Sequence, residues 1–262
     1  MTLQRIALVV EFDGRAFHGW QRQKNAMSVQ EVLEHALEKI EGRPVPLVAA
    51  GRTDAGVHAE ALLVHADVNK KRWQRSVRAY TQGVNQLLDG SICVVGVRAV
   101  KNDFHARFNC MERRYRYQIW NRSTPSAIHQ WRHWWMPKKL DLNVIKEASR
   151  CLLGLQDFSS FRASGCQAAS AVRNIKHIEI TCQGWEVFMD IHADAFLYHM
   201  VRNIAGSLVR VGTGSWHPEM LAEVLNARDR SRAAATAPAH GLYFVDAIYQ
   251  GFSAKQLIGK ES

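Results

Sequence analysis

The segment Gly51–His58, which reads GRTDAGVH, places an aspartate between two glycines. Glycines permit backbone conformations closed to other residues and allow a ligand to approach the chain closely. A carboxylate in such a loop, here that of Asp54, can stabilise positive charge on a substrate or attack the substrate covalently. Arg52 and His58 are placed to hold a carboxylate in its ionised form. An aspartate in a turn is also commonly a turn former that accepts a backbone hydrogen bond, and this spacing leaves both interpretations open.

The charge of the chain favours an anionic partner. The 262 residues carry a formal net charge of +10, and the sequence pI is about 9.6. An excess of Lys and Arg attracts polyanions and releases counterions when phosphates are neutralised. The basic residues are interspersed with apolar ones, which predicts a folded basic groove rather than a disordered basic arm. The net charge is equally compatible with a basic protein that binds no nucleic acid.

The bulk composition is that of a soluble globular protein, with 47% hydrophobic and 22% charged residues. No apolar run approaches the roughly 20 residues needed to cross a bilayer, and the first residues show no cleavage site, so we expect neither membrane insertion nor secretion. Five cysteines lie far apart, which matches neither a disulfide framework nor a paired zinc site and predicts reduced thiols in a cytoplasmic protein. They are Cys93, Cys110, Cys151, Cys166 and Cys182.

The first part of the chain predicts six elements that would position Asp54. Residues 5–12 read as a strand, and Ser28 followed by Glu31 forms a capping box for a helix that ends at Gly42. Further elements are strands near 45–50 and at 61–68, a helix over 76–88 and a strand over 92–100. The order β-α-β-β-α-β is that of the ferredoxin-like split unit.

The second part repeats this order of elements without repeating its residues. Expected elements are a strand over 114–120, a helix over 142–153, a hairpin of strands 175–182 and 185–193, helices over 198–211 and 218–226, and a strand over 241–249. We therefore predict an α+β fold with two ferredoxin-like domains, residues 1–103 and 104–262.

Several ordered blocks across nearly the whole chain resemble the tRNA pseudouridine synthase A family. The segment around Asp54 looks like the signature of that family. The other blocks are Phe12–Gly14, Gly19–Gln23, Ser28–Gln30, Phe104–Phe108, Arg113–Tyr117, Phe158–Arg162, His199–Asn203 and Gly241–Tyr243. Two places depart from the usual family pattern: no proline follows the leucines before Asp89-Gly90, and Phe17-His18 replaces an aromatic pair that usually includes tyrosine.

The resemblance implies roles for four residues. Asp54 matches the essential aspartate of the family, Tyr115 the tyrosine that packs against the target uracil, and Arg202 the arginine that pairs with the aspartate. Arg52 is the other arginine beside it. The resemblance leaves open whether the aspartate attacks the sugar, attacks the base or assists formation of a glycal.

The resemblance also implies an activity and an assembly. The activity is isomerisation of uridine to pseudouridine at positions 38, 39 and 40 of the tRNA anticodon stem-loop. The halves would form one extended, mostly antiparallel sheet with helices on one side, and a homodimer would build a basic cleft from both subunits. No atom is gained or lost in the reaction, so we expect no cofactor. We also expect no metal, because the scattered cysteines do not complete a zinc site.

Basic residues near the blocks are candidates for phosphate contacts, although a solvated surface role fits each of them equally well. These are Arg22, Lys24, Arg107, Arg113, Arg114 and Arg162. Alternation puts Tyr115 and Tyr117 on one face of a strand, so Tyr115 is also explained by packing alone. The tryptophans of the segment Trp131–Trp135 are expected to be core or interface anchors rather than RNA-stacking residues.

Two rival functions lack their sequence marks. His58-Ala59-Glu60 fits the His-x-Glu of a zinc nucleobase deaminase, but no Pro-Cys-x-x-Cys follows to complete the zinc site. A non-catalytic pair of RNA-recognition domains would usually carry the aromatic Lys/Arg-Gly-Phe/Tyr-Gly/Ala-Phe signature, which is also missing from the sequence.

Overall fold

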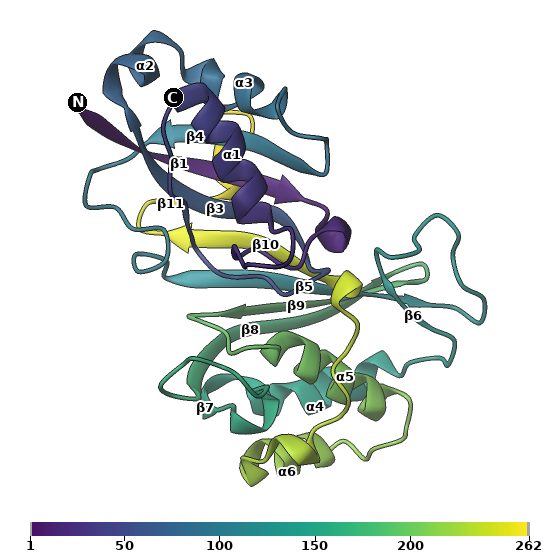
Figure 1. The fold of residues 1–262 in the computed structure, drawn as a ribbon. Helices are drawn as coiled ribbons and strands as arrows, with labels where there is room; N and C mark the ends of the chain where they lie inside the picture. Colours follow the sequence, from purple (N-terminus) through teal and green to yellow (C-terminus); the bar gives the residue numbers. More distant parts are fainter. Residues whose placement is uncertain (1, 261–262) are drawn as a thin grey trace. The chain divides into compact units, whose positions relative to one another are not determined.

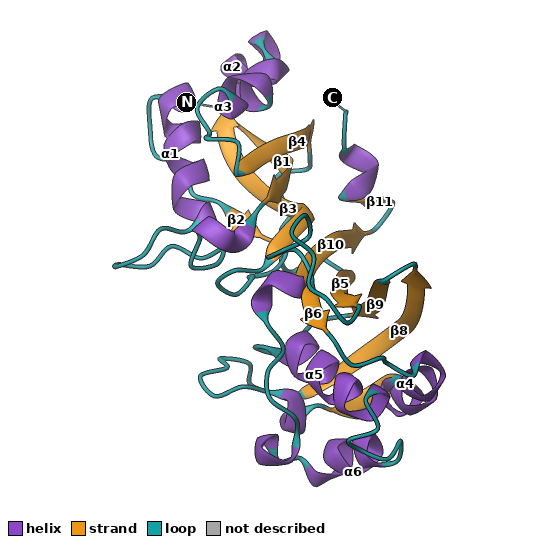
Figure 2. Cartoon of the chain, turned by 90° about the vertical axis from the view of Figure 1, so that its right-hand side faces the viewer, coloured by secondary structure: helices purple, strands orange, loops and turns teal. Residues whose placement is uncertain are grey.

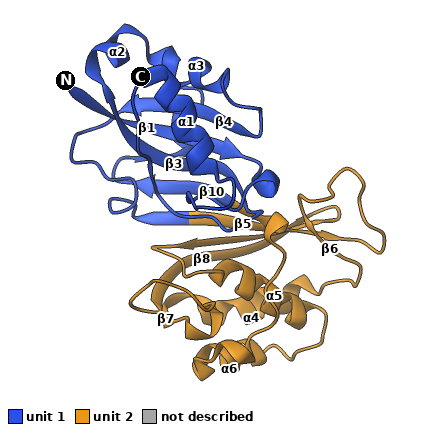
Figure 3. Cartoon of the chain, in the orientation of Figure 1, with its two compact units in different colours: residues 1–113, 244–262 blue, residues 114–243 orange. Residues whose placement is uncertain are grey.

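The computed structural model describes residues 2–260 (Figure 1), which form two compact units. Unit 1 consists of residues 1–113 and 244–262, and unit 2 of residues 114–243 (Figure 3). Both units combine strands with helices, so the predicted α+β class is confirmed. The division of the sequence into domains 1–103 and 104–262 stays a prediction.

Unit 1 is built on a central strand that is apolar on both faces. β1 (Leu3–Phe12) pairs antiparallel with β3 (His58–Asn69) on one side and with β4 (Ile92–Ala99) on the other. Its residues Ile6–Val10 are completely buried, which explains their continuous hydrophobic run. β2 (Val48–Ala49) pairs with β3, while β10 (Leu242–Tyr249) continues the sheet and pairs with β11 (Phe252–Ser253).

Helix α1 (Val29–Glu41) lies beside these strands, to their left in Figure 2. Its apolar face, which includes Leu33 and Leu37, is buried. The side-chain oxygen of Ser28 accepts a hydrogen bond from the Glu31 N–H at 3.3 Å, and Gly42 ends the helix with a φ of 70°. The predicted beginning and end of this helix are thus confirmed.

The single helix predicted over 76–88 is wrong. The chain forms α2 (Lys70–Arg75), a 3-10 turn at Val77–Tyr80 and α3 (Gln82–Asn85). Asn69 starts α2 early because its side chain accepts hydrogen bonds from the N–H groups of the second and third helical residues. At the other end, the Asn85 side chain exchanges two hydrogen bonds with the backbone of Val94, at 2.8 and 2.9 Å, which ties α3 to β4.

In unit 2 the strands pair in the order β5-β9-β8-β7. The strands are β5 (Glu112–Asn121), β7 (Gly154–Asp157), β8 (Val172–Gln183) and β9 (Glu186–Ala193). The predicted hairpin is confirmed, since β8 and β9 pair antiparallel around Gly184, which has a φ of 60°. Short β6 (Trp134–Met136) runs parallel to β5, and neither β6 nor β7 was expected from the sequence.

Three helices of unit 2 gather next to β8 (Figure 2). They are α4 (Leu142–Ser149), α5 (Met200–Gly212) and α6 (Met220–Ala227). Helix α4 contacts both β8 and α5, and α5 contacts α6. The helix predicted over 142–153 is shorter, because a 3-10 turn takes over at Arg150.

The tryptophans of segment Trp131–Trp135 are less buried than expected. Trp131 is 53% exposed and Trp135 is 41% exposed, so these two do not belong to the core, and the alternative that they are interface anchors stays a prediction. Trp134 is half-buried, and its ring meets that of Tyr117 edge to face. Within β6, Trp134 and Trp135 differ in burial because adjacent residues of a strand point to opposite faces.

No helix within residues 2–260 combines the length and the apolar character that a bilayer crossing requires.

A buried histidine in unit 1 makes stability depend on pH. The Nδ1 of His65 accepts a hydrogen bond from the Ala106 N–H at 3.1 Å. Burial, and then the charge of Arg5, lower the pKa of His65 to about 4. Between the unfolded value near 6.5 and that value, the unfolded chain binds more protons, so the free energy of unfolding should fall as the pH falls from about 6.5 to about 4.

Urea unfolding at a series of pH values checks this prediction. In His65→Asn an amide oxygen replaces the acceptor without titrating, so we expect a shallower loss of stability over the same pH window. The matched control is His35→Asn on the exposed side of α1, which should follow the wild-type curve. Equal curves for His65→Asn and wild type would show that His65 is not the responsible group.

Candidate active site

Asp54 lies in the loop that connects β2 to β3 in unit 1. Before the loop, the Ala50 N–H donates to the Leu63 carbonyl at 2.8 Å. Within it, the Val57 N–H donates to the Asp54 carbonyl at 3.1 Å, which closes a tight turn. The Asp54 side chain is half-buried, whereas Val57 and His58 after it are buried. The loop therefore holds a carboxylate at the surface of a fixed backbone.

The segment that follows β1 contacts this loop backbone to backbone. The Trp20 N–H donates to the Thr53 carbonyl at 3.1 Å, and the Gly56 N–H donates to the Phe17 carbonyl at 3.3 Å. A Cβ atom on Gly19 would lie 2.5 Å from the Thr53 oxygen, and Gly19 has a φ of +89°. A Cβ atom on Gly14 would lie 2.0 Å from the Val57 oxygen. Only glycine fits at both positions, which explains chemically why they accompany the Asp54 segment.

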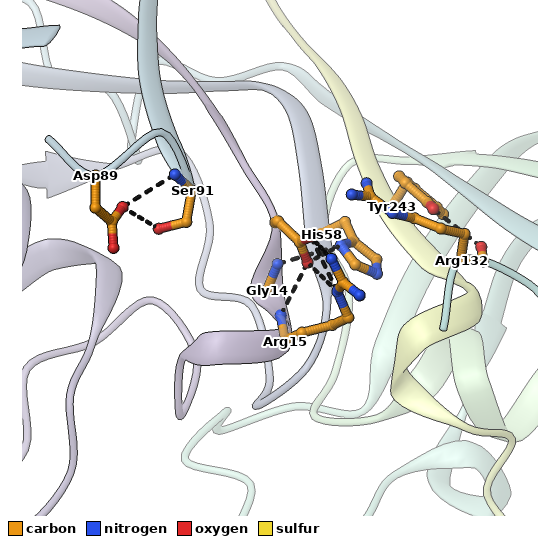
Figure 4. Close-up of polar contacts among 8 residues, drawn as sticks. Gly14, Arg15, His58, Asp89, Ser91, Arg132 and Tyr243 are labelled. Carbon is orange, nitrogen blue, oxygen red and sulfur yellow. Dashed lines mark hydrogen bonds and ion pairs between the residues drawn. The ribbon is translucent and has the colours of Figure 1, made fainter. Parts of the chain in front are cut away.

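His58 anchors the far end of the loop (Figure 4). It is buried, with its Nδ1 3.2 Å from the Gly14 nitrogen and 3.2 Å from the Asp13 Oδ1. The same aspartate pairs with Arg15 at 2.6 Å. From the sequence we expected His58 to help keep the Asp54 carboxylate ionised, and in the structure His58 contacts the carboxylate of Asp13 and the backbone of Gly14. Its role in this geometry is to fix the start of β3 against the turn after β1.

Two arginines of unit 1 bring positive charge to the Asp54 loop. Arg52 is exposed, and its pKa is lowered by partial burial and by the neighbouring charge of Arg107. Two guanidinium groups close enough to influence each other give this part of unit 1 a positive potential.

Arg113 braces this region. Its guanidinium donates to the carbonyls of Ala50 at 2.9 Å, Arg107 at 2.8 Å and Cys110 at 3.4 Å. It thus joins the residue before the Asp54 loop to the 104–111 segment. Of the other predicted contacts in unit 1, Arg22 pairs with Glu34 at 3.1 Å and Lys24 is exposed.

Tyr115 lies on β5 and is buried, with 7% of its surface exposed. Its ring meets that of Phe196 edge to face, with 4.9 Å between centroids. Tyr117, on the same face, is completely buried and its hydroxyl donates to the Pro238 carbonyl at 2.7 Å. The predicted alternation is therefore confirmed. Arg116, on the opposite face, makes a two-pronged ion pair with Asp190.

Arg202 lies in the first turn of α5 and is held by a neighbouring segment. Its Nε donates to the Ala237 carbonyl at 2.8 Å, and the Ala237 N–H donates back to the Arg202 carbonyl at 3.2 Å. The adjacent Asn203 is buried and bonds to the Phe161 carbonyl, to Arg230 and to Thr236. These bonds fix the backbone from which the Arg202 guanidinium extends.

An open groove of about 890 Å³ lies at the beginning of α5 in unit 2. Basic and aromatic side chains line it, among them Arg162, Tyr198, His199 and Arg230. Arg162 donates to the carbonyls of Cys166 at 2.9 Å and Ala168 at 2.7 Å, which shapes one wall. The volume and the lining suit an anionic ligand with flat rings.

The four residues with assigned roles are divided between the units. Asp54 and Arg52 belong to unit 1, and Tyr115 and Arg202 belong to unit 2. The supporting contacts of Phe196 and Ala237 had no signal in the sequence, because neither lies in a recognisable motif.

A family model described as tRNA pseudouridine synthase matches residues 8–109 and 148–250. Three similar proteins are named tRNA pseudouridine synthase A. That of Hydrogenovibrio crunogenus is 47% identical over 95% of this chain and 93% of its own length. That of Klebsiella pneumoniae strain 342 is 48% identical over 94% of this chain and 90% of its own length. That of Legionella pneumophila strain Lens is 43% identical over 94% of this chain and 92% of its own length. The resemblance of the sequence blocks is thereby confirmed, and the chain belongs to the tRNA pseudouridine synthase family.

Proposed function

We propose that this chain isomerises uridine to pseudouridine at positions 38, 39 and 40 of the tRNA anticodon stem-loop, with Asp54 as the essential carboxylate. The observation that carries the proposal is the loop of Asp54, which glycine contacts lock in place in a chain of this family. The net charge of +10 supports a polyanionic substrate.

The proposed reaction uses a carboxylate, and because no atom is gained or lost it requires no cofactor. The N1–C1′ bond of uridine breaks, the uracil turns, and a C5–C1′ bond forms; C5 loses a proton and N1 gains one. Cleavage places positive character on the sugar and negative character on the base. A carboxylate beside C1′ stabilises the positive sugar or attacks it. Alternatively, the same carboxylate attacks the base or assists formation of a glycal.

Residues of unit 2 complete the proposed site. Arg202 would pair with Asp54, since its Nε is anchored on Ala237 and a guanidinium offers further donors in a fixed fork. Tyr115 would pack against the uracil, and its edge-to-face contact with Phe196 would keep its ring in place. Arg52 would stand beside Asp54 and contribute positive charge with Arg107.

We also propose two ferredoxin-like halves that share one extended, mostly antiparallel sheet with helices on one side. The order β4-β1-β3, with β2 at β3, supports this for the first half because it is that of a ferredoxin-like unit. A homodimer with a basic cleft and a cytoplasmic location, where tRNA is modified, complete the proposal.

Binding of tRNA must expose a uridine that is stacked in a stem. Extrusion of a base costs a few kcal/mol, which phosphate contacts and aromatic groups must offset. We propose that six basic residues contact phosphate groups of the tRNA. They are Arg22, Lys24, Arg107, Arg113, Arg114 and Arg162. Because Arg113 and Arg162 donate to backbone carbonyls, their contribution includes shaping the segments that contact RNA.

Tritium release tests the proposed reaction. A tRNA transcript with uridine tritiated at C5 should lose tritium to water when incubated with the protein, because C5 gives up its hydrogen on bonding to C1′. A transcript with cytidine at positions 38–40 should release none. Release of the same size from both transcripts would place the reaction elsewhere in the tRNA, and no release from the first would contradict the proposed reaction.

Gly19→Ala should slow pseudouridine formation about 100-fold, because displacement of a catalytic group by about 1 Å has effects of this size. The added Cβ atom would meet the Thr53 carbonyl one residue before Asp54. Rates under single-turnover conditions and a melting curve check this.

The matched control for this change is Gly42→Ala. Gly42 also has a positive φ, of +70°, but nothing lies within 4 Å of an added Cβ atom there. We expect the control to lose about 1–2 kcal/mol of stability and to keep the wild-type rate. Equal rates in both variants would refute the tight coupling between Gly19 and the Asp54 loop.

A further inference from the structure

Three side chains in unit 2 that the proposed reaction does not use come together outside its residues. His129, His133 and Glu186 each offer one ligand atom, and these atoms all lie within 4.8 Å of one another. The Nε2 of His133 is 3.0 Å from the Oε1 of Glu186. Two imidazole nitrogens and one carboxylate oxygen form a ligand set that transition metal ions prefer.

His133 lacks the hydrogen bonds that a buried histidine normally makes. Only 8% of its surface is exposed, and within residues 2–260 neither of its ring nitrogens has a hydrogen-bond partner. The Glu186 Oε1 is the charged atom beside this ring, at ion-pair distance from Nε2. Because an unsatisfied buried polar atom costs about 1–3 kcal/mol, this arrangement calls for a ligand that the nitrogens can bind.

Both segments that supply the ligands are held in place by other contacts. Glu186 begins β9, directly after Trp185, whose carbonyl accepts a hydrogen bond from the Asn121 N–H at 2.8 Å. The ring of His129 stacks on Trp120 with 4.8 Å between centroids, and the backbone N–H of His129 donates to the Ser126 hydroxyl at 3.1 Å.

The backbone between the two histidines adopts an unusual conformation. Trp131 has a φ of 65°, which a bulky residue rarely adopts. The Tyr243 hydroxyl donates to the Arg132 carbonyl at 2.9 Å, as Figure 4 shows. Such a backbone persists only where its surroundings impose it, and the histidines on either side of Trp131 both have a ligand atom within 4.8 Å of the Glu186 carboxylate.

We propose that His129, His133 and Glu186 bind a divalent transition metal ion, with zinc as the best fit. Zinc takes imidazole and carboxylate ligands in tetrahedral geometry, and a water would be the fourth ligand here. The ion would fasten the segment between β5 and β6 to β9, a structural role separate from uridine isomerisation. The sequence analysis expected no metal because the cysteines are unpaired. This site uses none of them, and Glu186 is too far along the chain for a spacing motif.

Metal titration of the full-length chain tests the proposal. The protein is prepared without a histidine tag, stripped with a chelator and titrated calorimetrically with Zn²⁺, Co²⁺ and Mg²⁺. We expect one Zn²⁺ per chain, visible absorption typical of tetrahedral Co²⁺, and no uptake of Mg²⁺, which prefers oxygen ligands. Zn²⁺ should also raise the melting temperature, because it binds the folded chain.

Variants locate the ion. His133→Ala should weaken Zn²⁺ binding at least 100-fold, and Glu186→Gln, which keeps the side-chain shape, should weaken it and change the Co²⁺ spectrum. His177→Ala is the matched control, since His177 lies on exposed β8 near Glu179 and His192. The control should bind like wild type. Wild-type affinity in Glu186→Gln and His133→Ala, or no Zn²⁺ bound by the wild-type chain, would overturn the proposal.

Discussion

Asp54→Asn is expected to lower the single-turnover rate of pseudouridine formation by about 10⁴-fold or more, as removal of a catalytic group does in other enzymes. Asparagine keeps the shape of the side chain but cannot supply the negative charge or the nucleophile. The loop should keep its position, because its anchors are backbone contacts with Gly14, Gly19 and Trp20. We therefore expect tRNA affinity and the melting temperature to stay close to wild type.

The control for this change is an aspartate that only forms a turn. Asp89 is exposed and accepts hydrogen bonds from the backbone and the hydroxyl of Ser91 (Figure 4). Asp89→Asn should leave the rate unchanged. If Asp54→Asn keeps a rate close to that of Asp89→Asn, Asp54 is a turn former and the proposed chemistry is wrong.

Arg202→Leu is expected to reduce turnover by about 10³-fold, the effect of losing a group that stabilises charge in the transition state. Leucine preserves the apolar part of the side chain but loses the guanidinium and its bond to the Ala237 carbonyl. Because the first turn of α5 is also fixed through Asn203, the fold should remain. Single-turnover rates and tRNA binding measured together separate a loss of chemistry from a loss of affinity.

The last turn of the same helix supplies a matched control. Arg210 is exposed on α5, so Arg210→Leu removes an equal charge away from the proposed site. We expect the control to react at the wild-type rate. Full activity in Arg202→Leu would refute the pairing with Asp54, and an equal loss in both variants would show that net charge alone is responsible.

Much of the fold could be predicted from local sequence patterns. The strand at β1 and the helix at α1 were found because a buried apolar run, a Ser28 cap and Gly42 are all local features. The predicted helix over 76–88 failed because its breaks depend on contacts with distant residues. Asn85 bonds to Val94, and the Tyr80 hydroxyl bonds to Glu41 at 2.5 Å.

The candidate site, too, could be predicted only where its features are local in the sequence. Asp54 could be singled out because its glycine setting is visible in the sequence, and the family resemblance then gave it a role. The reason for Gly14 and Gly19 could not be seen, since it lies in how closely two loops approach. The partners of His58 and the meeting of His133 with Glu186 were hidden for the same reason.

The role of Asp54 can be tested by mapping the product of the reaction. Unmodified tRNA is incubated with wild-type protein and, in parallel, with Asp54→Ala protein, and pseudouridine is then mapped at single-nucleotide resolution. We expect pseudouridine within positions 38–40 after incubation with the wild type and none with the variant. Pseudouridine formed by the Asp54→Ala protein, or none formed by the wild type, would contradict it.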